Sequence, residues 1–103
     1  MNLLKRIFGT ATEIDFKQLQ RNGALILDVR TPDEFKSGHI SGAINVPLQN
    51  LSKETIRINK MKKPVITCCL SGGRSSIALK VLKQAGVEVY NGGGWTSLRS
   101  KLR

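Results

Sequence analysis

The clearest chemical motif in the chain is a six-residue segment that runs Cys-Leu-Ser-Gly-Gly-Arg, residues 69–74, and is followed by Ser75. Two adjacent glycines let the backbone curl tightly, so that its N–H groups turn inward and form an anion-binding nest. A helix that begins near Arg74 or Ser75 adds the positive end of its dipole. A thiol in such surroundings loses its proton easily, with a pKa of about 3.5–7.5. We therefore predict that Cys69 is a nucleophilic thiolate held in a cradle for negative charge.

The other residues that could do chemistry have simpler interpretations. Cys68 precedes Cys69 on a predicted strand, where successive side chains face opposite sides, so we expect Cys68 to fill the core. A bond between the two adjacent cysteines would be too strained to serve as a structural disulfide. The single histidine, His39, lies in a Gly-His-Ile turn and is expected to make structural hydrogen bonds. No set of residues has metal-ligand spacing, so we expect no metal and no organic cofactor.

Buried strands must position the reactive segment. Apolar runs rich in β-branched residues predict four strands, at residues 24–29, 43–46, 64–69 and 87–90. The first and third runs are apolar almost throughout, which is typical of strands covered on both faces and hence of a parallel sheet. Asp28 and Cys69 lie near the carboxyl ends of these two strands, at the edge of the sheet where ligands collect in open α/β folds.

Helical patterns fill the segments between the strands. Asp15 and Thr31 are the expected N-caps of two short helices, and the second also has Pro32 and Glu34 in the positions of a capping box. Longer helices are predicted at residues 51–58, with Ser52 as a cap, at residues 75–85, closed by Gly86, and at residues 95–103, after a turn at residues 91–94. Strands that alternate with helices indicate an α/β fold with a mainly parallel sheet and helices on both faces.

The length of 103 residues suits one domain. We expect a single domain over residues 12–103 and an N-terminal extension over residues 1–11. The extension carries one short apolar stripe, formed by Leu3, Leu4, Ile7 and Phe8. It lacks the pattern of a signal peptide, and no stretch approaches the length of a membrane span. Two adjacent cysteines do not make a secreted disulfide framework, so we expect a soluble, cytoplasmic protein.

The charge of the chain is strongly basic, with 17 Lys and Arg against 7 Asp and Glu and a net charge of +10. Such a field attracts anions and raises their rate of encounter. The basic residues are spread along the chain, and three Phe, one Tyr and one Trp are too few for a base-stacking platform. We therefore expect small anionic substrates, with an acidic protein as a further candidate partner, and no nucleic acid.

Several stretches together resemble the motifs of single-domain rhodaneses, in the order and spacing of that family. They are residues 27–35 and 38–47, which resemble its opening motifs, residues 69–75, which resemble its active-site loop, and residues 91–95, which resemble its closing Gly-Gly turn and tryptophan. Each motif alone is a weak signal, but jointly they are specific and span roughly residues 12–103. The resemblance implies the rhodanese-like three-layer fold.

The same resemblance implies a sulfurtransferase. Cys69 would take sulfane sulfur from an anionic donor, such as thiosulfate, a polysulfide or a protein persulfide, and pass it from a persulfide to a thiol or to cyanide. Arg74 is implied as a second catalytic residue. Asp28 and Arg30 resemble the pair that supports the loop, although a salt bridge that only shapes the fold remains an alternative. The implied substrate-binding loop consists of Leu70, Ser71, Gly72, Gly73 and Ser75.

Two features of the loop refine this expectation. Its six residues, 69–74, are similar in number to those of rhodaneses that move sulfur, whereas related phosphatases and arsenate reductases have a loop one residue longer. The variable positions Leu70, Ser71 and Gly73 carry no charge, whereas rhodaneses specialised for thiosulfate often have a basic residue here. A polysulfide or a protein persulfide is therefore an alternative donor.

Three other functions remain open at this point. The first is a slow persulfide carrier or binding module that docks a protein partner and turns over small donors poorly. The second is a phosphatase or arsenate reductase, against which the short loop argues. The third is a nucleic-acid-binding protein, which would bind in a salt-sensitive manner whether or not Cys69 is present.

Overall fold

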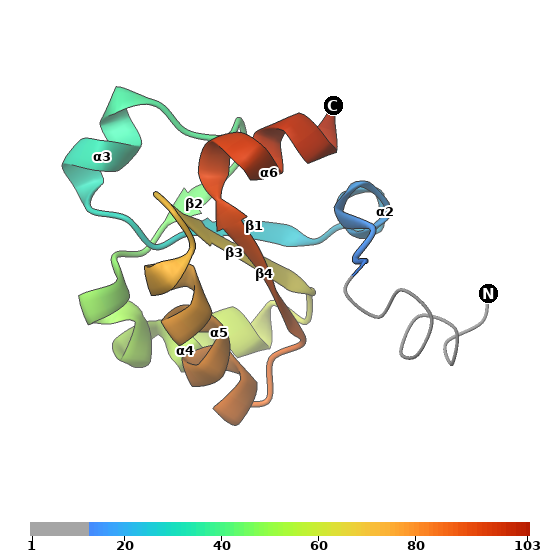
Figure 1. Ribbon diagram of the computed structural model, residues 1–103. Helices are drawn as coiled ribbons and strands as arrows, with labels where there is room; N and C mark the ends of the chain where they lie inside the picture. The colour runs from blue at the N-terminus through green and yellow to red at the C-terminus, as the bar shows by residue number, and fades with distance from the viewer. Residues whose placement is uncertain (1–12) are drawn as a thin grey trace.

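The computed structural model describes residues 13–103, which form a four-stranded parallel sheet with helices on both faces (Figure 1). The expected extension, residues 1–11, with the stripe of Leu3, Leu4, Ile7 and Phe8, lies outside the described residues. In chain order the elements are α2 (Phe16–Arg21), β1 (Leu25–Asp28), α3 (Pro32–Ser37), β2 (Ile44–Asn45), the 3₁₀ turn η1 (Leu48–Asn50), α4 (Leu51–Lys60), β3 (Val65–Cys69), α5 (Gly73–Gln84), β4 (Val89–Gly94) and α6 (Trp95–Leu102).

The strand order is β2-β1-β3-β4, which confirms the predicted parallel α/β architecture. The two apolar runs become the central strands β1 and β3, where Asp28 pairs in register with Cys68. Both strands therefore end at the same edge of the sheet. In the part of the chain that the structure describes, no helix is long and apolar enough to cross a membrane.

Two hydrophobic cores form, one on each face of the sheet. The core beneath α4 and α5 contains buried residues of both helices and of the strands, among them Leu27, Leu51, Cys69 and Leu82. The core beneath α2 and α6 contains Phe16, Ile26, Ile66, Cys68 and Leu98. Figure 1 shows α4 and α5 on one side of the strands and α2 and α6 on the other. The two adjacent cysteines therefore point to opposite faces, as the strand alternation predicts.

The predicted helix starts are largely confirmed. Asp15 caps α2 by accepting the backbone N–H of Gln18 at 3.0 Å. Thr31 and Glu34 form a full capping box at the start of α3, with Pro32 in the first turn. The starts of two later helices differ slightly: α4 begins at Leu51 after Asn50, rather than with Ser52 as a cap, and α5 begins at Gly73.

The turn predicted at residues 91–94 is wrong, because these residues continue strand β4 as far as Gly94. Asn91 pairs with Thr67 of β3, and a register shift follows before Gly94 pairs with Cys69. A Cβ atom on Gly92 would lie 2.7 Å from the carbonyl oxygen of Thr67 and 2.9 Å from the side chain of Ile66. The glycines therefore allow a strand to approach its neighbour closely, where the sequence pattern alone suggested a turn.

Candidate active site

The sulfur of Cys69 lies inside a nest of backbone N–H groups between β3 and α5. Its Sγ accepts hydrogen bonds from the N–H of Gly72 at 3.0 Å and from the N–H of Ser75 at 3.3 Å. The Cys69 thiol can also donate to Ser75 Oγ at 3.5 Å. Gly72 precedes the helix with a φ of +111°, a left-handed conformation that glycine adopts without strain. The loop therefore curls around the sulfur in the manner that its glycines predict.

Hydrogen bonding lowers the pKa of Cys69. Burial alone would raise the pKa, since the Cys69 residue is 1% exposed, but hydrogen bonds from Ser75, Gly72 and Ser71 outweigh that effect. The neighbouring Cys68 shows the opposite result, because burial first and the charge of Asp28 second raise its pKa to about 12. Of the two thiols, Cys69 has the lowered pKa, and a lowered pKa favours the nucleophilic thiolate form.

Arg74, in the first turn of α5, forms an ion pair with Glu34 of α3. Its two Nη atoms donate to Oε1 and Oε2 of Glu34 at 2.7 and 3.0 Å, a bidentate pair. The guanidinium of Arg74 and the hydrogen bonds from Thr31 lower the pKa of Glu34 to about 2, and Glu34 raises the pKa of Arg74. Arg74 therefore fastens the start of α5 to α3, and much of its charge is balanced by Glu34.

Glu34 is a site residue that the sequence analysis missed, because its capping-box position already accounted for it. One carboxylate performs both tasks, since Oε1 accepts from the backbone N–H of Thr31 at 2.9 Å as well as from Arg74. The two residues of the ion pair lie 40 positions apart in the chain. The capping box around Glu34 therefore gave no indication that Glu34 also pairs with Arg74.

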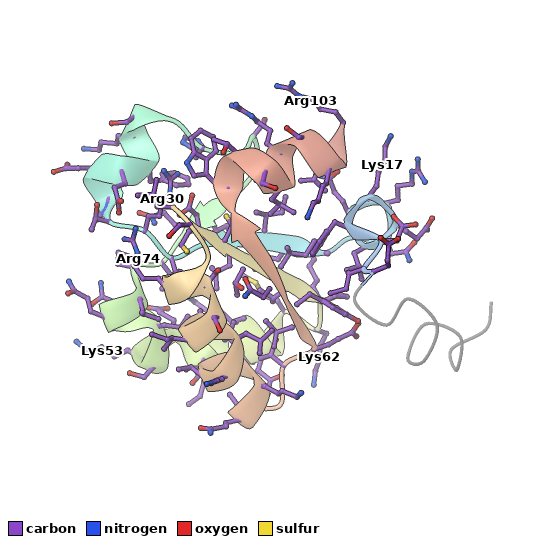
Figure 2. The ribbon with its side chains drawn as sticks, viewed as in Figure 1. Lys17, Arg30, Lys53, Lys62, Arg74 and Arg103 are labelled. Atoms are coloured by element: carbon purple, nitrogen blue, oxygen red, sulfur yellow. The ribbon has the colours of Figure 1, made fainter. Side chains whose placement is uncertain are left out.

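Asp28 and Arg30 form a buried ion pair at the end of β1. Arg30 Nη2 donates to Asp28 Oδ2 at 2.7 Å and to the carbonyl oxygen of Gly38 at 2.7 Å. The guanidinium also lies 4.7 Å from the centre of the Trp95 ring, and Arg30 Nη1 donates to the carbonyl oxygen of Glu34. The pair thus holds α3 in place, and through Glu34 it supports Arg74. Figure 2 shows Arg30 and Arg74 on the same side of the molecule.

The remaining predicted loop residues form the rim and base of the nest. Leu70 is 59% exposed and Ser71 is exposed beside it, whereas Ser75 is fully buried. Gly73 is the first residue of α5. Ser75 Oγ is 2.7 Å from Oδ1 of Asn91 on β4, a second contact that the sequence analysis did not foresee. The loop is therefore uncharged at its rim, where Leu70 and Ser71 lie, and hydrogen-bonded at its base.

His39 makes the structural contacts that were expected of it. Its Nδ1 lies 2.7 Å from the carbonyl oxygen of Phe35, and the two rings stack with their centres 3.7 Å apart. Among residues 13–103 there is no group of three or more His, Cys, Asp or Glu side chains that could hold a metal ion.

Comparison with known proteins relates this site to a family. A family model described as Rhodanese-like domain matches residues 12–101. The chain is 40% identical over 101 residues to Uncharacterized protein YqhL of Bacillus subtilis, an alignment that covers 96% of this chain and 79% of that protein. It is 33% identical over 86 residues to Thiosulfate sulfurtransferase GlpE of Pseudomonas aeruginosa, an alignment that covers 82% of this chain and 77% of that protein.

Solved structures give the same result. A rhodanese with anions from E. coli superposes with a TM-score of 0.67 and 30% identity over 73% of this chain and 91% of that chain. SSP1007 of Staphylococcus saprophyticus superposes with a TM-score of 0.70 and 31% identity over 87% of this chain and 89% of that chain. On the evidence of sequence, fold and loop together, the chain belongs to the rhodanese-like domain family.

Proposed function

We propose that this protein is a sulfurtransferase that carries sulfane sulfur on Cys69. Membership of the family, and relatives named thiosulfate sulfurtransferase, support sulfur transfer in general. The observation that carries the proposal for this chain is the position of Cys69 Sγ, which accepts two backbone hydrogen bonds at 3.0 and 3.3 Å. These bonds stabilise an anionic sulfur without the help of a neighbouring base.

The proposed reaction has two displacement steps. The Cys69 thiolate attacks the outer sulfur of thiosulfate, a new S–S bond forms, and sulfite leaves with the electrons of the bond that breaks. The persulfide then loses its outer sulfur to cyanide or to an acceptor thiolate, which yields thiocyanate or a new persulfide and returns the Cys69 thiolate. Attacking and leaving groups are anionic in both steps, so no general base is needed.

The donor preference follows from the rim of the loop. Leu70, Ser71 and Gly73 bring no charge to the entrance, and Arg74 is already paired with Glu34. Attraction of a small anion therefore depends on basic residues outside the loop, in a chain of net charge +10, rather than on a free cation within the loop. We propose a polysulfide or a protein persulfide as a donor beside thiosulfate.

The direct test is the intact mass of the protein after incubation with thiosulfate or polysulfide. The wild type is expected to gain one sulfur atom, about 32 Da, and to lose it on addition of cyanide. Cys69→Ser is expected to gain nothing, whereas the matched variant Cys68→Ser behaves as the wild type. If neither donor adds sulfur to the wild type, or if Cys69→Ser still gains it, the proposed function is wrong.

A second candidate function is a slow persulfide carrier that docks a protein partner. The exposed Leu70 at the rim of the loop favours it, because 59% of this apolar residue is open to a partner. This function predicts that the persulfide forms but that small donors and acceptors turn over slowly. A steady-state assay with thiosulfate and cyanide separates the two candidates.

A further inference from the structure

Asn91, on strand β4, contacts the residue that follows the active-site loop, Ser75, through its side-chain amide oxygen. Its Oδ1 accepts the hydroxyl of Ser75 at 2.7 Å and the backbone N–H of Gly93 at 2.9 Å. A backbone N–H can only donate, so this second bond fixes the amide with its oxygen toward Ser75. The sequence motif in which Asn91 lies did not reveal this contact, because the turn predicted there is a strand that runs beside the loop (Figure 1).

The Ser75 hydroxyl has one proton to donate and three possible hydrogen-bond partners. Its Oγ lies 2.7 Å from Asn91 Oδ1, 3.1 Å from the carbonyl oxygen of Gly72 and 3.5 Å from Cys69 Sγ. A hydroxyl donates one hydrogen bond and accepts two. The two oxygens are acceptors only, whereas the sulfur donates as a thiol and accepts as a thiolate. The direction of the Ser75 hydroxyl therefore depends on the charge of Cys69.

We propose that Asn91 is a positioning residue, which accepts the hydrogen bond of the Ser75 hydroxyl whenever the inner sulfur of Cys69 carries no negative charge. In the thiol state Cys69 donates to Ser75, and Ser75 donates to Asn91. When the Cys69 proton leaves to solvent, the hydroxyl turns to the anionic sulfur. In the persulfide of the proposed function, on which this last step rests, the charge lies on the outer sulfur and the hydroxyl returns to Asn91.

Two ionisable side chains near the site interact with the charge of Cys69. They are Arg74 and Cys68, and that charge raises the pKa values of both. Arg74 is held by Glu34, and Cys68 has a pKa of about 12 and stays neutral at ordinary pH. Asp28 and Arg30 form a buried ion pair with each other at the end of β1. A change at Asn91 therefore reaches the sulfur chiefly through Ser75.

The test is a double-mutant cycle on the full chain, read by the ultraviolet absorbance of the Cys69 thiolate against pH. Asn91→Ala removes the acceptor that favours the thiol state, and is expected to lower the pKa of Cys69 by about 0.5. Asn91→Asp keeps an acceptor and adds negative charge, and is expected to raise the pKa of Cys69. In the Ser75→Ala background, Asn91→Ala is expected to leave the pKa of Cys69 unchanged.

Two results would overturn the proposal: a shift from Asn91→Ala that is equal with and without Ser75, or no shift in either background. If Asn91→Ala does not fold, Asn91→Asp gives the same test, since its effect must be larger when Ser75 is present. The titration needs no sulfur donor, so it is independent of the proposed function. The persulfide step has its own measurement, in which Asn91→Ala is expected to discharge sulfur to cyanide about twofold faster than the wild type, and only when Ser75 is present.

Discussion

At the scale of single residues, two adjacent cysteines have opposite chemistry because a strand places them on opposite faces of the sheet. Cys69 is the last residue of β3, and its sulfur accepts a hydrogen bond from the N–H of Ser75 in the first turn of α5. Cys68 lies in the other core, where burial raises its pKa to about 12. Two neighbouring positions on one strand thus have thiols whose pKa values shift in opposite directions.

This difference predicts that substitutions of Cys68 affect mainly stability, whereas substitutions of Cys69 affect mainly activity. Cys68→Ala is expected to lower the free energy of unfolding by about 1 kcal/mol, because it leaves unfilled space in a packed core, and to retain persulfide formation. Cys69→Ala is expected to abolish persulfide formation. Urea unfolding and intact mass measure the two properties. Loss of the persulfide in Cys68→Ala, with an unchanged fold, would contradict this assignment.

At the scale of elements, the Glu34–Arg74 pair connects α3 to α5 and so supports the loop from outside. The pKa of Glu34 is about 2, against an ordinary value of 4.5. A carboxylate whose pKa falls on folding stabilises the folded state fully above the ordinary pKa, and this contribution disappears as the pH falls toward the lowered value. The stabilisation by Glu34 is therefore complete above pH 4.5 and is lost as the pH falls to about 2.

Glu34→Gln should therefore lower the melting temperature at neutral pH, and the difference from wild type should narrow between pH 4.5 and about 2. Glutamine still suits the capping box, so the start of α3 is expected to survive the change. Glu54→Gln is the matched control, because it breaks an exposed ion pair with Arg57 on α4 and should have a smaller effect. Equal losses in the two variants, or a loss that does not vary with pH, would contradict the bridging role.

Most elements could be predicted from sequence because their signals are local. The capping box at Thr31 and the apolar run of β3 are examples, and each depends on residues within a few positions. The contacts that complete the site could not be predicted in this way. Asn91 meets Ser75 only because β4 pairs beside β3, and Glu34 meets Arg74 only after the sheet has formed. Such contacts are set by tertiary packing, which no spacing in the sequence records.

At the scale of the whole molecule, the site lies at one end of a strongly basic protein. Several of its few carboxylates are held in ion pairs with arginine, namely those of Asp28, Glu34 and Glu54. Two exposed lysines differ in their position relative to the site. In Figure 2, Lys53 lies on the same side as Arg74, whereas Lys62 lies at the far end of the sheet, just before β3 begins. The two lysines therefore offer equal charge at different places, Lys53 in the first turn of α4 and Lys62 before the start of β3, the strand that Cys69 ends.

This arrangement predicts that charge near the carboxyl edge of the sheet, rather than net charge alone, guides an anionic donor. Lys53→Gln and Lys62→Gln each lower the net charge of +10 by one. Lys53→Gln is expected to reduce kcat/KM for thiosulfate about twofold at low salt, and Lys62→Gln to change it little, because a surface charge acts over a screening length of about 10 Å at 0.1 M salt. Raising the salt concentration should remove the difference between the variants. Equal effects at both positions would show that only the overall charge matters, and a loss that persists at high salt would mean that Lys53 acts by direct contact with the donor.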